Sequence, residues 1–119
     1  MNRRIVDLLN ELSGGAGARA DMPSLSPKEA LILKFLTEHG ETYGLKLVAS
    51  SGGKLKRGTV YVTLGRMEDK GFVESRQEEQ APEAVGLPRR LYKPTARGAA
   101  VLKAWERAAL SLLAEEAAS

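Results

Sequence analysis

Apolar residues recur at helical spacing through most of this 119-residue chain, and two short stretches break that period. The first helical stretch covers residues 2–13, where apolar side chains three or four positions apart form one stripe. Gly14 and Gly15 end it, and the glycine-rich residues 14–23 predict a flexible linker. We expect the stripe to bury itself against a dimer partner, with a loosely docked terminus as the alternative. Its residues are Ile5, Leu8, Leu9 and Leu12.

Three further helices are predicted between residues 26 and 70. At residues 26–29, a serine N-cap, a proline at the first helical position and a glutamate that completes a capping box start a helix running to about His39. A second helix opens at Tyr43-Gly44 and stops at Gly52-Gly53, and a third covers about residues 57–70. Three helices of this length joined by short turns predict a helix-turn-helix unit.

The period changes after the third helix. Residues 72–77 predict a strand, the polar residues 78–87 a loop, and residues 89–93 a second strand that Pro94 closes. A strand, a loop and a strand directly after a helix-turn-helix are the plan of a winged helix. The expected fold is therefore mainly α with a small β-wing.

Thr95 caps a last helix that runs nearly to the end of the chain. This helix carries more apolar side chains than so small a domain should cover, so we expect it to dimerise together with residues 2–13. The expected organisation is a terminal helix and linker (1–23), a winged-helix domain (24–94) and a dimerisation helix (95–119). The dimerisation residues of the last helix are Leu102, Trp105, Ala109, Leu112 and Leu113.

Charge adds a candidate partner to this picture. The net charge is only +3, but residues 54–97 hold ten basic and six acidic side chains. A basic zone on a near-neutral body is typical of nucleic-acid binding, although a solvated surface of mixed charge is the common alternative.

Several functional classes are excluded by residue types. The chain has no cysteine, and its single histidine, His39, cannot form a zinc site or a catalytic triad alone, so we expect no metal, no cofactor and no enzyme activity. No apolar run reaches the length of a membrane span, so we expect no membrane association and a cytoplasmic protein.

Four motifs between Leu25 and about Leu102 resemble those of the PadR family of bacterial transcriptional regulators. They are residues 25–33, residues 41–47 with their tyrosine–glycine pair, residues 57–64 followed by 67–74, and residues 88–98. Val62 stands where the family often has proline, and the glycine-rich N-terminal extension is not typical of it.

The resemblance implies a homodimeric DNA-binding regulator, by family expectation a repressor, with the third helix in the major groove. The wing, residues 78–90, would lie on the flanking backbone or minor groove. Core packing competes with DNA contact for Tyr43 and Tyr61, and a plain surface strand is the alternative for the wing arginines. The expected DNA-binding residues are Tyr43, Lys56, Arg57, Thr59, Tyr61, Thr63, Arg66, Arg89, Arg90 and Lys93.

Two further possibilities stay open. Small aromatic compounds often release PadR-like proteins from DNA, which makes Trp105 a candidate effector contact, although packing at the dimer interface is the more common use of such a residue. A winged-helix protein-interaction module without DNA binding is the alternative function.

Overall fold

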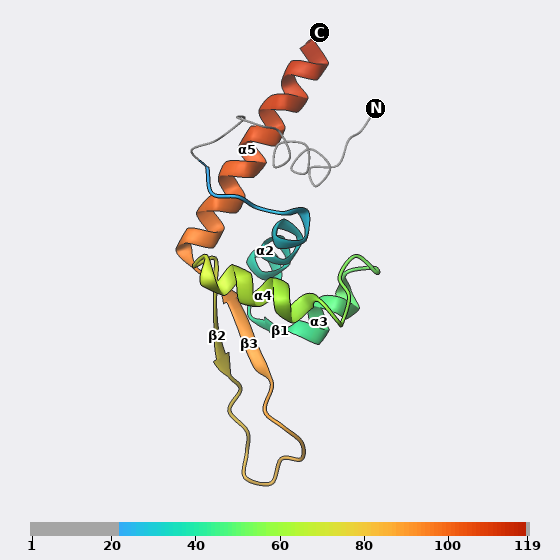
Figure 1. Ribbon diagram of the computed structural model, residues 1–119, viewed down its shortest axis with the longest axis vertical. Helices are drawn as coiled ribbons and strands as arrows, with labels where there is room; N and C mark the ends of the chain where they lie inside the picture. Colours follow the sequence, from blue (N-terminus) through green and yellow to red (C-terminus); the bar gives the residue numbers. More distant parts are fainter. Residues whose placement is uncertain (1–21, 119) are drawn as a thin grey trace.

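The computed structural model describes residues 22–118, which form a winged helix with a long terminal helix (Figure 1). The expected helix at residues 2–13, with Ile5, Leu8, Leu9 and Leu12, lies outside the described residues. The described elements are α2 (Pro27–His39), β1 (Thr42–Tyr43), α3 (Gly44–Ser50), α4 (Val60–Asp69), β2 (Val73–Gln77), β3 (Arg90–Pro94) and α5 (Ala96–Ala118).

The start of α2 confirms the predicted capping box. The Ser26 hydroxyl accepts a hydrogen bond from the Glu29 backbone N–H at 3.2 Å, and a Glu29 carboxylate oxygen accepts one from the Ser26 N–H at 2.8 Å. These bonds satisfy two backbone donors that no helical carbonyl can reach. Gly40 ends the helix with a φ of 88°, a conformation that side chains other than glycine rarely adopt.

The three strands form one antiparallel sheet in the order β1-β3-β2. Ser75 pairs with Tyr92 on one side of β3, and Thr42 pairs with Tyr92 on the other. The sequence pattern missed β1, because two residues are too few to show a strand period. Beyond the paired residues, β2 and β3 extend into a long loop that points away from the helices (Figure 1).

α4 begins later than the sequence predicts. Residues 57–59 form a turn, in which the N–H groups of Thr59 and Val60 donate to the Lys56 carbonyl, and the helix starts only at Val60. Gly58 disfavours helix, and Thr59 makes no side-chain cap, so nothing local holds these residues in helical geometry. Lys56 and Arg57 therefore precede the helix that they were expected to begin.

The core lies between α2, α4 and the first half of α5. α2 contributes Ile32, Leu33 and Leu36, and α4 contributes Val60, Leu64 and Met67; all six side chains are buried.

The expectation that Leu102, Trp105 and Ala109 form an exposed dimerisation surface is wrong for this arrangement. All three are buried within the single chain, and Trp105 is only 2% exposed. The Trp105 indole N–H donates to the Pro23 carbonyl at 2.8 Å, so the segment that leads into α2 covers part of α5. The domain covers more of α5 than the length and apolar content of this helix suggested.

A close backbone approach joins α5 to the base of the wing. A Cβ at Gly98 would lie 2.0 Å from the Phe72 carbonyl oxygen, which accepts a hydrogen bond from the Thr95 N–H at 3.0 Å. The predicted cap is confirmed, since the Thr95 hydroxyl accepts from the Gly98 N–H at 3.0 Å. Only glycine fits at position 98 without moving the backbone.

Candidate nucleic-acid interface

The outer face of α4 is the part of the helix-turn-helix that is open to a partner. Val60, Leu64 and Met67 point into the core, so the opposite side of the helix carries Val62, Gly65 and Arg66. Val62 is 55% exposed and Arg66 is also exposed. We use "the outer face of α4" for Thr59, Tyr61, Val62, Gly65 and Arg66.

Tyr61 lies at the edge of this face, and its side chain is partly packed and partly exposed to solvent. Its ring is 48% exposed and packs against the start of α3, where a Cβ at Gly44 would come within 2.7 Å of the ring carbon Cε1. The tyrosine–glycine pair of α3 therefore has a packing cause: the missing side chain at position 44 leaves room for Tyr61. The phenol is held beside the N-terminus of α3.

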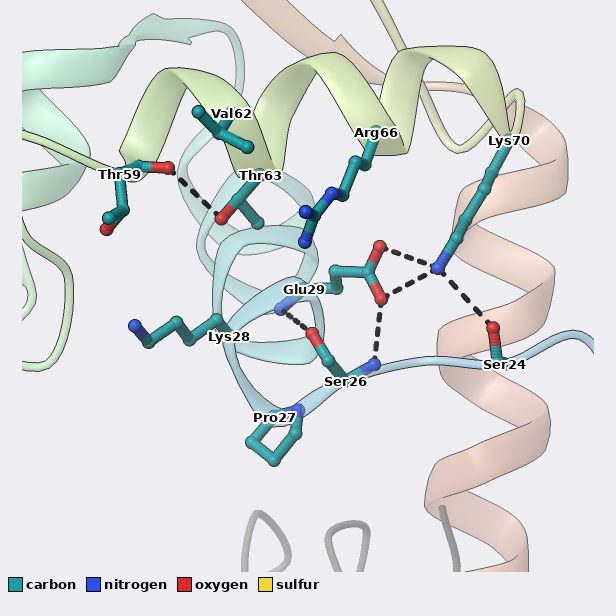
Figure 2. A pocket seen from close by; sticks show the side chains of 10 residues that line it. All are labelled: Ser24, Ser26, Pro27, Lys28, Glu29, Thr59, Val62, Thr63, Arg66 and Lys70. Atoms are coloured by element: carbon teal, nitrogen blue, oxygen red, sulfur yellow. Dashed lines mark hydrogen bonds and ion pairs between the residues drawn. The ribbon is translucent and has the colours of Figure 1, made fainter. Parts of the chain in front are cut away.

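A groove of about 680 Å³ runs between α4 and the N-terminal end of α2 (Figure 2). Lys28 stands on the α2 side and Arg66 on the α4 side. Neither forms an ion pair with any of residues 22–118. Sequence reasoning missed Lys28, because its place beside α4 depends on how two helices pack. The groove is lined by Ser24, Ser26, Pro27, Lys28, Glu29, Thr59, Val62, Thr63, Arg66 and Lys70.

Lys70 has a structural role at the end of the same groove. Its ammonium lies 2.8 Å and 3.0 Å from the two oxygens of Glu29 and 3.4 Å from the Ser24 hydroxyl. The Glu29 side chain is only 5% exposed, so this pair is largely withdrawn from water. It ties the C-terminal end of α4 to the capping box of α2, and Lys70 is thereby neutralised (Figure 2).

The two threonines of the predicted site differ in availability. The Thr63 hydroxyl donates to the Thr59 carbonyl at 3.2 Å and is half-buried, so its donor is already used. Thr59 is exposed at the N-terminal end of α4. Lys56 and Arg57, in the turn before it, are exposed and form no ion pair within the described part of the chain.

Most cations of the wing have carboxylate partners. Arg89 binds Glu78 through two hydrogen bonds, Nε to Oε1 at 3.0 Å and Nη2 to Oε2 at 2.8 Å, and its guanidinium lies 4.2 Å from the centre of the Tyr43 ring. Lys93 lies 3.2 Å from Glu74. Among the wing residues predicted to contact DNA, Arg90 alone has no ion pair with a described residue.

The ion pairs change the acidity of the wing carboxylates. Hydrogen bonds from the Arg89 guanidinium hold the pKa of Glu78 below its usual value, and those from Arg76, 2.7 Å away, do the same for Glu41. Both carboxylates are therefore ionised at neutral pH and cancel the charge of the arginines that hold them.

The tip of the wing, residues 79–88, is acidic and apolar. It contains Glu79 and Glu83 and no basic residue, and Val85 and Leu87 are almost fully exposed. The wing arginines therefore lie at the base of the loop, and its tip presents no positive charge to a phosphate backbone.

Comparison with known proteins identifies the family. Residues 32–104 match the model of the transcriptional regulator PadR-like family. The chain belongs to this family of transcriptional regulators. No match is found among curated proteins.

Solved PadR-family structures share this fold. A PadR family regulator from Eggerthella lenta is 28% identical, with 75% of this chain and 76% of that chain covered and a TM-score of 0.58. One from Clostridium difficile is also 28% identical, with 66% and 81% covered and a TM-score of 0.54. Bacillus subtilis PadR in complex with operator DNA is 24% identical over 64% of this chain and 44% of that chain, with a TM-score of 0.54.

No helix among residues 22–118 has both the length and the hydropathy that crossing a bilayer requires. The same residues contain no group of three or more histidine, cysteine or acidic side chains placed to hold a metal ion.

Proposed function

We propose that this PadR-family regulator is a homodimeric repressor that binds operator DNA with the outer face of α4 in the major groove. One observation carries the proposal: the cations that surround this exposed face are not neutralised by described carboxylates. They are Lys28, Lys56, Arg57 and Arg66.

The placement of these cations suits a duplex. A helix in the major groove lies between two phosphate backbones, so positive charge is useful on both of its flanks. Lys28 from α2 and Arg66 from α4 line the groove between these two helices (Figure 2). Lys56 and Arg57 precede the N-terminal end of α4. The complex of Bacillus subtilis PadR with operator DNA supports a duplex as the partner.

The wing has a smaller part in the proposed complex than the sequence suggested. Arg90 is the cation that it can offer to the flanking backbone or minor groove, since Arg89 and Lys93 are paired with carboxylates. Tyr43 supports Arg89 at the base of the wing, and this contact fixes the wing relative to α3.

Dimerisation is proposed for the distal half of α5. This helix runs to Ala118, and its last turns lie beyond α2, α3 and α4 (Figure 1). Leu110 is exposed there and Leu112 and Leu113 are half-buried, which leaves apolar surface for a second copy. Release by an aromatic effector is expected from the family resemblance only. Trp105 is buried in the core and is not among the residues that line the groove between α4 and α2.

A salt titration of DNA binding tests the proposal. Binding of a fluorescent duplex from upstream of the gene should weaken steeply as salt rises, because cations of the protein displace counterions from phosphates. Arg66→Ala should lower the salt slope by about one for each bound protomer, and therefore by about two for a homodimer. Arg107→Ala, which removes an exposed arginine of α5, is the matched control and should leave the slope unchanged. No binding at low salt to any duplex would contradict the proposal and favour a protein-interaction module.

Light scattering tests the dimer. Replacing Leu110 and Leu113 with glutamate should give a monomer, whereas Ser111→Glu, at an exposed position between them, should leave a dimer. A dimer that survives the double substitution would place the interface elsewhere.

A further inference from the structure

Val62 occupies a place on α4 where a polar residue would be expected. It is 55% exposed at the middle of the outer face, and Pro27 is the other apolar residue among those that line the groove beside it. Resting on the proposed function, we propose that Val62 reads the C5-methyl group of a thymine in each operator half-site.

The helix geometry sets the direction of this side chain. At 100° per residue, Val62 lies nearly opposite the buried Val60, Leu64 and Met67, so it points straight away from the core. Valine is branched at Cβ and strongly prefers one rotamer in a helix, so its two methyl groups are presented at a defined position. A contact of a few ångströms with one base edge needs this kind of fixed placement.

The neighbours of Val62 allow a close approach. Gly65 follows by one turn, and a Cβ built there would meet no atom within 4 Å, so this part of the outer face has no side chain to hold a base away. Asp69, further along the same side, is acidic and disfavours contact with phosphates at the C-terminal end. Both features favour contact through the segment from Thr59 to Arg66.

The chemistry of the major groove then selects the base. Thymine presents the one apolar group among the base edges there, its C5-methyl, while the other edges present hydrogen-bond donors and acceptors. Val62 can neither donate nor accept, so against cytosine or guanine it would desolvate polar groups without replacing their bonds to water. An isolated exposed valine is ordinary on a protein surface. The position of this one, facing the proposed duplex, gives it a role in recognition.

The experiment separately removes the C5-methyl group from the DNA and the two γ-methyl groups of Val62 from the protein. A randomised duplex pool selected with the full-length protein supplies a binding sequence. Each conserved thymine in it is then replaced by deoxyuridine, which keeps the base pair and deletes only the methyl group. At one thymine position in each half-site, this replacement should weaken binding of the wild-type protein about fourfold. That is the effect of losing one buried methyl group.

Variants decide whether Val62 is responsible. With Val62→Ala, deoxyuridine at the same position should have almost no further effect, as a double-mutant cycle for a direct contact requires. Val85→Ala, at a valine of the wing tip that is even more exposed (98%, against 55% for Val62), should keep the full sensitivity of the wild type. Both substitutions lie on the surface and should leave the circular dichroism spectrum unchanged.

The outcomes separate this inference from the function on which it rests. If the pool yields no enriched sequence and no duplex binds, the proposed function fails and the inference falls with it. If a sequence is enriched but no thymine is sensitive to deoxyuridine, or Val62→Ala keeps the sensitivity, the inference alone is overturned and the DNA-binding regulator stands.

Discussion

The cations around the outer face of α4 and those of the wing are similar in number, but their surroundings differ. Around α4, Lys56, Arg57 and Arg66 have no carboxylate partner in residues 22–118. On the wing, Arg89 and Lys93 are each held by a glutamate. A cation that is already paired must give up its partner before it can bind a phosphate, so the two regions differ in available charge far more than in composition.

The difference also concerns what each set of ion pairs does. The Glu29–Lys70 pair is partly buried, with the Glu29 side chain 5% and the Lys70 side chain 35% exposed, and it joins two helices, so it positions α4. The Glu78–Arg89 pair is exposed and joins neighbouring strand ends of one hairpin. We infer that the first sets the geometry of the recognition helix, and that the second limits the affinity of the wing for DNA.

The largest expected effect is a difference in DNA affinity between substitutions of a cation beside α4 and of a cation on the wing. Arg57→Ala should weaken operator binding by about 1–3 kcal/mol, since it removes an unpaired cation beside α4. Arg89→Ala should change affinity much less, because Glu78 already neutralises this guanidinium. Fluorescence anisotropy measures both, with Arg107→Ala as the control. An equal loss for the two variants would mean that the wing ion pair opens on DNA.

The Glu29–Lys70 and Glu78–Arg89 pairs should also differ in how much each contributes to the free energy of unfolding. Glu29→Ala should lower the free energy of unfolding by about 2 kcal/mol, because it removes a cap and leaves the partly buried Lys70 without its partner. Glu78→Ala should have a small effect, as exposed pairs usually do. Urea denaturation gives both values, and Glu38→Ala on the exposed side of α2 is the control. A Glu78→Ala variant as unstable as Glu29→Ala would contradict the assignment of roles.

A smaller effect should appear when the wing is released from its carboxylate. Glu78→Gln removes the charge that neutralises Arg89 while keeping side-chain size, so operator binding should tighten by about twofold and the salt slope should rise. Glu115→Gln on α5 makes the same charge change away from the proposed interface and should have no such effect. Unchanged affinity would mean that Arg89 does not reach the DNA even when free.

The smallest effect is a pH dependence of the wing. Arg89 lowers the pKa of Glu78 below 4.5 in the folded protein, so their pair stabilises the fold above the ordinary carboxyl range and this contribution is lost as pH falls through the lowered value. Wild type should therefore exceed Glu78→Gln slightly in melting temperature at pH 7, and the gap should narrow as pH falls below the ordinary carboxyl range. A gap that stays constant throughout acidification would rule out titration of this carboxylate as its cause.

Local signals were enough to place most elements. The capping box at Ser26 and Glu29, the glycine after α2 and the Thr95 cap act over three or four residues, and the structure has each where it was predicted. The start of α4 was wrong by three residues because no capping side chain marks it, and β1 is too short to have a pattern.

The candidate site was less predictable than the fold. Lys28 was not among the predicted residues, and the ion pair of Arg89 with Glu78 was not foreseen. Both features depend on neighbours 30 or more residues away or across a hairpin. Val62 was noted as a departure from the family pattern, but its direction on α4 emerged only with the buried face of that helix.

By itself, the sequence determined the winged helix and the family, because periodicity, capping and turn residues are local properties that specify elements and their order. Only the tertiary structure decided that Leu102 and Trp105 belong to the core, that Lys28 lies across a groove from α4, and that Arg89 and Lys93 of the wing are paired with carboxylates. The physical reason is that burial and ion pairing depend on distances between segments remote in the chain, and composition does not contain those distances.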